Sequence, residues 1–234
     1  MSARRNRLDR VIARQLNISQ DAVLPLLAER RIKVAGVIAT ARDQLFDGFA
    51  VITVNDVVLQ QQQPVYLMLH KPCGVLSSTS DPRHPVATSL IDHPAVATLH
   101  IAGRLDLHAS GLLLLTNDGR WSRRISDPQS GIEKEYLVTL KNPLTDDYAP
   151  AFAAGMHFPF EDIVTRPAKL EMLEERLARV TLHEGRYHQI KRMFGRFRNP
   201  VLAIHRIRTG TLTLDPDLQS GNWRELAPWE AENI

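Results

Sequence analysis

The stretch from Gly103 to Gly119 reads GRLDLHASGLLLLTNDG and decides the fold of the chain around it. Its four consecutive leucines, residues 112–115, form a short apolar run bounded by turn signals, which is typical of a buried strand. A Ser-Gly pair before the run and an Asn-Asp-Gly sequence after it predict turns at both ends of the strand. Arg104 and Asp106 are therefore expected on a loop that leads into a core strand, where a rigid anchor can fix polar side chains.

The residues on either side of this strand predict a mixed order of strands and helices over 65–234. Strand patterns occur at 65–71 and 135–140, on both sides of a turn within 167–185, and at 208–214. Helical patterns occur at 118–125, 146–154 and 186–197. Hairpins mixed with helices favour an α+β fold with a mainly antiparallel sheet over a regular alternation of parallel strands and helices.

A separate, smaller unit is indicated at the N-terminus. Apolar residues recur at helical spacing between Leu8 and Leu16, and short strand patterns follow within 31–54. The segment QQQQP, residues 60–64, is polar, has no periodicity and ends in proline, which is typical of a linker. We therefore expect an N-terminal domain over 1–59, a linker over 60–64 and a second domain over 65–234.

The composition is that of an ordinary globular protein. The 234 residues are 44% hydrophobic and 24% charged, which excludes a disordered chain. Apolar runs stay far below the roughly 18 residues that a membrane span needs, and the first residues lack the apolar segment of a secretory signal. The single cysteine, Cys73, excludes an internal disulfide and a cysteine-built metal site. These observations predict a cytoplasmic protein without a membrane segment.

Positive charge is concentrated in one part of the chain. The segment 184–208 contains seven arginines and lysines against one acid, Glu184, with Tyr187, Phe194 and Phe197 between them. A solvated helix face normally mixes both signs of charge, and the near absence of acids disfavours that interpretation. A basic stripe with interleaved aromatic residues is typical of a surface that binds nucleic acid.

The residues that could carry chemistry have ordinary interpretations when each is taken alone. Asp106 could cap a turn or pair with Arg104, Tyr136 could be a half-buried strand residue, and Lys191 could be one more charge on a basic helix. Ser110 could be a nucleophile, but its surroundings lack the Gly-x-Ser-x-Gly turn of hydrolases. The histidines show no metal-ligand spacing.

Taken together, these residues give a more specific picture. The segments GRLDLHASGLLLLTNDG, EKEYLV and EGRYHQIKRMF, in this order, resemble the RsuA-type pseudouridine synthases, which modify ribosomal RNA. LHKPCGVLSSTSD and HRIRTGTLTL resemble the opening and closing segments of the catalytic domain of that family. The N-terminal unit resembles the S4-like RNA-binding fold, with two departures: Ala35 stands where that fold usually has Asn or Asp, and Pro25 falls in its RNA-facing helix.

The resemblance implies an activity and a set of site residues. It implies that a uridine is isomerised to pseudouridine without cofactor or metal, by Asp106 as the nucleophile, Lys191 as its cationic partner and Tyr136 against the uracil. It further implies that RNA is contacted by Arg104, Arg186, His188, Arg192 and Arg206. The expected partner is ribosomal RNA or an assembling ribosomal subunit, and the expected state is a monomer.

Three alternatives to this interpretation remain open. The Tyr187-His188 pair resembles the enzymes of the small ribosomal subunit, whereas large-subunit relatives tend to carry Asn-Arg at this place. A non-catalytic RNA-binding or ribosome-assembly protein could use the same basic surface, although it would not need Asp106, Tyr136 and Lys191 together. A hydrolase with Ser110 as its nucleophile would act on esters without RNA.

Overall fold

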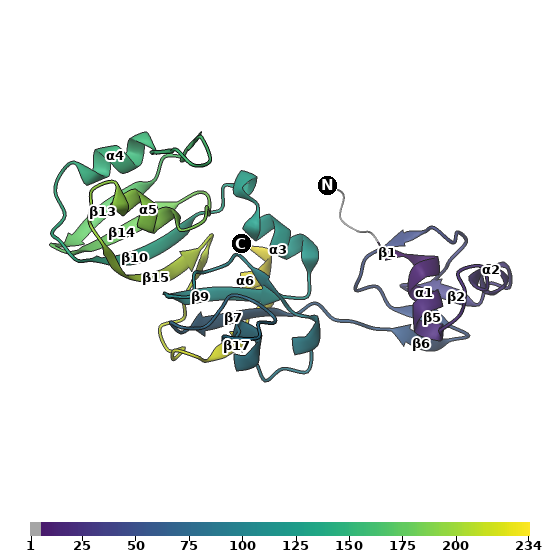
Figure 1. Ribbon diagram of the computed structural model, residues 1–234. Coiled ribbons are helices and arrows are strands. Elements are labelled where there is room, and N and C mark those ends of the chain that lie inside the picture. The colour runs from purple at the N-terminus through teal and green to yellow at the C-terminus, as the bar shows by residue number, and fades with distance from the viewer. Residues whose placement is uncertain (1–5) are drawn as a thin grey trace. The chain divides into compact units, whose positions relative to one another are not determined.

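The computed structural model describes residues 6–234 and divides the chain into two compact units, 1–64 and 65–234 (Figure 1). The mixed helices and mainly antiparallel strands that the sequence predicts are confirmed. Strand β6 (Val57–Gln60) extends through the first residue of the segment expected as a linker. Among the described residues, no helix has both the length and the apolar character needed to cross a membrane.

The N-terminal unit has its own apolar core. Its elements are β1 (Asn6–Arg7), α1 (Leu8–Leu16), α2 (Val23–Ala28), β2 (Ile32–Val34), β3 (Val37–Ile38), β4 (Leu45–Phe46), β5 (Ile52–Val54) and β6. Strands β3, β2, β5 and β6 form an antiparallel sheet in that order, and β1 pairs with β4. Leu8 and Ile12 of α1 are fully buried against Ile32 and Ile52 of this sheet.

Pro25 and Ala35, the two departures from the S4-like pattern, differ in how well each suits its backbone conformation. Pro25 is the third residue of α2, where a backbone N–H has no partner within the helix, so the proline does not interrupt the hydrogen bonding of the helix. Ala35 has a φ of 49° in the turn between β2 and β3. This left-handed conformation suits Asn or Gly better than a residue with a plain methyl side chain, so the departure at Ala35 has a conformational cost.

The larger unit is built on a nine-stranded sheet with the order β13-β14-β10-β15-β9-β7-β17, to which β16 and β8 are added at β15 and β9. The strands are β7 (Tyr66–Lys71), β8 (His100–Ala102), β9 (Ala109–Thr116), β10 (Lys134–Leu140), β13 (Lys169–Glu174), β14 (Leu177–Leu182), β15 (Val201–Thr209), β16 (Leu212–Thr213) and β17 (Trp223–Glu225). The helices are α3 (Gly119–Ser126), α4 (Tyr148–Ala154), α5 (Gln189–Gly195) and α6 (Pro228–Glu232). Short 3₁₀ turns lie at Ala87–Leu90, Val96–Thr98 and Pro128–Ser130, and a small hairpin is formed by β11 (His157–Phe158) and β12 (Ile163–Val164).

The leucine run is the centre of this unit. All four leucines of β9 are fully buried, and they alternate between two apolar clusters. Leu113 and Leu115 face the cluster that contains residues of α4 and α5, whereas Leu112 and Leu114 face the cluster that contains residues of α3. Figure 1 shows α4 and α5 beside β10, β13 and β14, away from α3. The strand is therefore buried on both faces, as the continuous apolar run predicts.

The Ser-Gly pair before the leucines does not form the expected turn, because both residues lie within β9. Gly111 pairs with Arg206 of β15 in the parallel part of the sheet, and its φ is +106°. A Cβ atom at this position would lie 2.2 Å from the carbonyl oxygen of Arg206. Glycine is needed here for the close approach of β9 and β15 rather than for a turn.

Candidate active site

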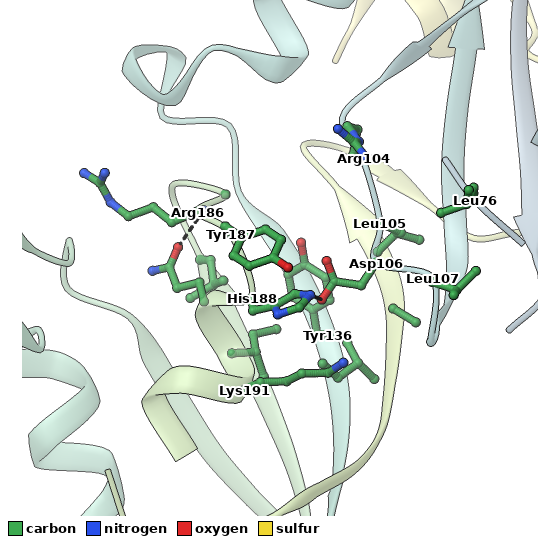
Figure 2. A pocket seen from close by; sticks show the side chains of 16 residues that line it. Leu76, Arg104, Leu105, Asp106, Leu107, Tyr136, Arg186, Tyr187, His188 and Lys191 are labelled. Carbon is green, nitrogen blue, oxygen red and sulfur yellow. Dashed lines mark hydrogen bonds and ion pairs between the residues drawn. The ribbon is translucent and has the colours of Figure 1, made fainter. Parts of the chain in front are cut away.

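A pocket of about 510 Å³ lies in the larger unit and brings together segments that are far apart in the sequence. Such a volume is within the range of pockets that bind small organic groups. Its lining includes six of the eight residues that the sequence nominates: Arg104, Asp106, Tyr136, Arg186, His188 and Lys191 (Figure 2). Arg192 and Arg206 are not part of this lining.

The loop that carries Asp106 is held at one end by Arg206. This arginine is only 2% exposed. Its guanidinium donates to the carbonyl oxygen of Leu112 at 2.7 Å, to that of Gly103 at 3.0 Å and, more weakly, to that of Arg104 at 3.4 Å. Arg206 therefore joins the leucine strand to the loop, and a contact with an RNA phosphate would require it to leave these carbonyls.

Lys71 holds the other end of the same loop. Its side chain is fully buried, and its ammonium donates to the carbonyl oxygens of Ala109 at 2.6 Å and Pro72 at 2.9 Å, with a longer contact to Leu107 at 3.4 Å. Burial lowers the pKa of Lys71 to about 8, against the opposing effect of the charges of Cys73 and Asp106. The buried donors of Lys71 and Arg206 together fix the backbone on which Asp106 stands.

Asp106 lies at the edge of the pocket with a partly exposed side chain. The Nε2 atom of His188 is 3.6 Å from its Oδ2 atom, a pair that is ionic when the histidine is protonated. Lys191 extends from α5 into the same pocket, below Tyr136 in Figure 2, but within residues 6–234 no ion pair joins it directly to Asp106. Of the two basic residues from the segment 188–191 that line the pocket, His188 is within ion-pair distance of Asp106 and Lys191 is not.

Tyr136 forms a wall of the pocket. It belongs to β10, a central strand paired with β14 and β15, and its side chain is 7% exposed. The strand therefore gives the ring little freedom to move, and the ring contributes a flat apolar surface close to the Asp106 loop. Such a surface is suited to contact with a planar base.

The segment before α5 is fixed by a buried carboxylate that the sequence analysis did not recognise as part of the site. Glu184 is 1% exposed and accepts hydrogen bonds from the backbone of Arg166 and from the side chains of Arg186 and Gln189. His188 adopts a left-handed conformation with a φ of 49°, so α5 begins at Gln189 and not at 186 as expected. The sequence held one signal for Glu184, since it is the single acid among seven basic residues and has many possible partners. An acid can be buried when it is paired in this way.

The basic stripe of the sequence does not form one continuous basic surface. Arg192 donates to Glu161 and lies 3.7 Å from the centre of the Phe158 ring, and Arg208 pairs with two glutamates of the strand region before and within β10. Arg206 is buried as described above. Arg186 is exposed but pairs through Nε with Glu184, whereas Arg196 and Arg198 are exposed and carry positive charge that faces solvent.

Ser110 does have a histidine partner, but the pair lies outside the pocket lining. Its Oγ atom is 2.9 Å from Nδ1 of His205, and burial lowers the pKa of that histidine. The ring of His205 faces His70, and in the described part of the chain no carboxylate is bonded to it. The arrangement that orients a histidine in Ser-His-Asp hydrolases is not formed by these residues. Among residues 6–234 no cluster of side chains could hold a metal ion.

Comparisons with known proteins match most of this chain. A family model described as RNA pseudouridylate synthase matches residues 65–195. A ribosomal small subunit pseudouridine synthase A of Pseudomonas aeruginosa is 46% identical over 229 residues, which are 97% of this chain and 98% of that protein. The protein of the same name from Escherichia coli is 42% identical, with 97% and 99% covered. A crystal structure of a pseudouridylate synthase superposes with a TM-score of 0.71 at 37% identity, over 97% of this chain and 98% of that one.

Proposed function

Because the chain belongs to the RNA pseudouridylate synthase family and is thus a pseudouridine synthase, we propose that it isomerises a uridine of small-subunit ribosomal RNA, and that Asp106 is its nucleophile. The family expected from the sequence motifs is confirmed by the family match and by the full-length relatives. The observation that carries the proposal for the site is the pocket itself, which gathers Asp106, Tyr136 and Lys191 from three distant segments.

The reaction sets clear demands on this pocket. The N1–C1′ bond of the uridine breaks, the base turns, a C5–C1′ bond forms, the C5 proton is lost to solvent, and N1 takes up a proton. No atom is imported and nothing is oxidised, so the site needs a reactive group, an opposite charge and a surface that retains the detached base. The Asp106 carboxylate can act on the nucleotide covalently, since carboxylates form sugar intermediates in other enzymes.

The other two residues complete this arrangement. The ammonium of Lys191 supplies positive charge within the pocket, opposite in sign to the carboxylate of Asp106. The ring of Tyr136 supplies the flat surface on which a uracil can rest while it turns. The target base must leave its stack to reach Asp106, which costs a few kcal/mol that RNA contacts elsewhere must offset.

The RNA contacts that offset this cost are assigned to arginines at the pocket and to the N-terminal unit. We assign RNA binding to Arg104 and Arg186, which are exposed at the pocket, and to the N-terminal unit, which we interpret as an S4-like domain. On helix α1 of that unit, Arg10 and Arg14 are exposed and available for phosphates. Contacts of this kind fix the register of the RNA without reading its sequence. We propose a cytoplasmic monomer that acts on ribosomal RNA or on an assembling subunit.

The proposal is tested by two linked measurements. Pseudouridines are mapped in both ribosomal RNAs from cells with and without this protein, and release of tritium from C5-labelled uridine is measured with purified enzyme. We expect one small-subunit pseudouridine to disappear and Asp106→Asn to abolish tritium release while RNA affinity persists. Asp92→Asn, which changes an exposed aspartate outside the pocket lining, is the matched control.

The outcomes separate the alternatives. Loss of a large-subunit pseudouridine would assign the enzyme to the other ribosomal RNA, and near-normal turnover by Asp106→Asn would contradict the assignment of the nucleophile. A protein that binds RNA without any tritium release would be a binding protein. Hydrolysis of esters that is lost in Ser110→Ala would support the hydrolase instead.

A further inference from the structure

Tyr187 is an exposed aromatic residue at the rim of the pocket. Of the four tyrosines, it is the only one that is exposed, with 75% of its surface accessible. One face of its ring is stacked on His188, with ring centres 3.9 Å apart and planes inclined by 21°. Exposure alone is ordinary for a surface aromatic residue, but Tyr187 combines a stacked inner face with a place in the lining of the pocket.

The segment that presents this ring is held by hydrogen bonds to Glu184 and Gln189. His188 adopts a left-handed backbone conformation, which is uncommon for a residue with a side chain and costs about 1 kcal/mol or more. The buried Glu184 binds the side chains of Arg186 and Gln189 on both sides of the tyrosine, and Gln189 Oε1 also accepts from the backbone of Arg186. The ring is therefore held in place at its base, with its outer face towards solvent.

The position of the ring relates it to the proposed reaction. His188, on which the ring of Tyr187 is stacked, also lies 3.6 Å from the Asp106 carboxylate. Figure 2 shows Tyr187 and His188 beside Asp106, while Arg186 extends outward from the pocket. A nucleotide whose base reaches Asp106 must have its neighbour in the strand near this rim, because one backbone phosphate joins the two nucleotides.

We propose that the outer face of Tyr187 is a stacking subsite for the base adjoining the target uridine, with Arg186 at the phosphate between them. This inference rests on the proposed function and adds to it a determinant of which uridine is chosen. Stacking of a base on an aromatic side chain accepts any base, and alanine substitution shows that it contributes about 1 to 3 kcal/mol. The subsite therefore selects for an unpaired neighbouring base more than for its identity.

The experiment is a double-mutant cycle that combines substitutions of Tyr187 with changes to the RNA substrate. A transcript that contains the target uridine is compared with two copies that lack a base, one at the preceding and one at the following nucleotide. Tritium release gives kcat/KM for wild type, Tyr187→Leu, which keeps an apolar contact with His188, and Tyr187→Phe, which keeps the ring. Phe160→Leu is the matched control, since Phe160 is 97% exposed but does not line the pocket.

We expect Tyr187→Leu to lower kcat/KM on the intact transcript by about 5- to 150-fold, the equivalent of the stacking energy. Its effect should vanish on one of the two transcripts without a base, and Tyr187→Phe and Phe160→Leu should remain near wild type. An equal loss on all three transcripts would mean that the ring acts only through His188, and no loss on the intact transcript would mean that nothing stacks there. Either result would overturn the subsite alone, whereas inactivity of the wild type on both ribosomal transcripts and assembling subunits would overturn the proposed function with it.

Discussion

Replacement of Arg206 with methionine removes the guanidinium that joins the Asp106 loop to the leucine strand, while it keeps an unbranched stem of similar length. Two of the hydrogen bonds of Arg206 are short, at 2.7 Å to Leu112 and 3.0 Å to Gly103, and the contact with Arg104 at 3.4 Å adds little. A hydrogen bond from a charged group contributes about 1.5 to 3 kcal/mol, and a buried carbonyl left without a donor is costly. We therefore expect Arg206→Met to lower the free energy of unfolding by about 3 to 6 kcal/mol.

The loss of unfolding free energy can be followed for the larger unit separately, within the full chain. All three tryptophans, Trp121, Trp223 and Trp229, belong to residues 65–234, so their fluorescence in urea follows the unfolding of that unit. The same variant should lose activity by about 100-fold or more under conditions where it is folded, since a displacement of about 1 Å at a reacting group has a cost of this size. Its RNA affinity and the salt dependence of binding should stay near wild type.

The exposed Arg196 provides the matched control for this variant. Arg196→Met should leave the unfolding free energy within about 0.5 kcal/mol of wild type, and it should weaken RNA binding with a shallower salt dependence. The reasoning is refuted if Arg206→Met unfolds like wild type and instead weakens RNA binding in the manner of Arg196→Met. Arg206 would then contact phosphate, as the family resemblance implies, and its carbonyl contacts would not hold the loop.

Further predictions concern the two lysines and the N-terminal unit. Lys191→Met should remove most activity at saturating RNA with little change in RNA affinity, and a variant with near-normal single-turnover rates would transfer the cationic role to His188, the nearer group. Between pH about 8 and 10.5 the folded chain has released the Lys71 proton that the unfolded chain still binds, so the stability of wild type relative to Lys71→Met should rise with pH in urea unfolding. A stability difference that is independent of pH would contradict the lowered pKa. Residues 65–234 alone should fold but bind RNA more weakly and with less salt dependence, and an insoluble product would show that the two units share a core.

Local patterns in the sequence predicted the framework of the larger unit. The apolar run of β9 predicted a strand buried on both faces, and its leucines do alternate between two clusters. The Asn-Asp-Gly sequence predicted the end of that strand, and Asp118 caps α3 by accepting from the backbone of Arg120 and Trp121. These features depend on residues that are close in the sequence, so periodicity and turn chemistry are sufficient to predict them.

The distribution of charge could not be predicted in the same way. The segment 184–208 contains one acid, but strand and loop geometry bring acids from elsewhere: Glu161 to Arg192, and Glu133 and Glu135 to Arg208. The partners are 31 to 75 positions apart in the sequence. Net charge along a segment therefore indicated a basic surface, whereas only the fold determined which of its arginines remain free to meet RNA.

Gly111 shows how a local and a distant constraint combine at the site. In the sequence it belongs to a Ser-Gly pair that is typical of a turn, yet it lies inside β9 because its missing side chain lets β15 come within contact distance. That approach sets Arg206 opposite Gly111, and from there its guanidinium reaches the carbonyl oxygens of Gly103 and Arg104 in the loop that carries Asp106. A methyl group at position 111 would push the two strands apart, and the displacement would reach Asp106 through Arg206. The buried leucine strand therefore anchors the loop, and Gly111 sets the position from which Arg206 binds the carbonyl oxygens of that loop.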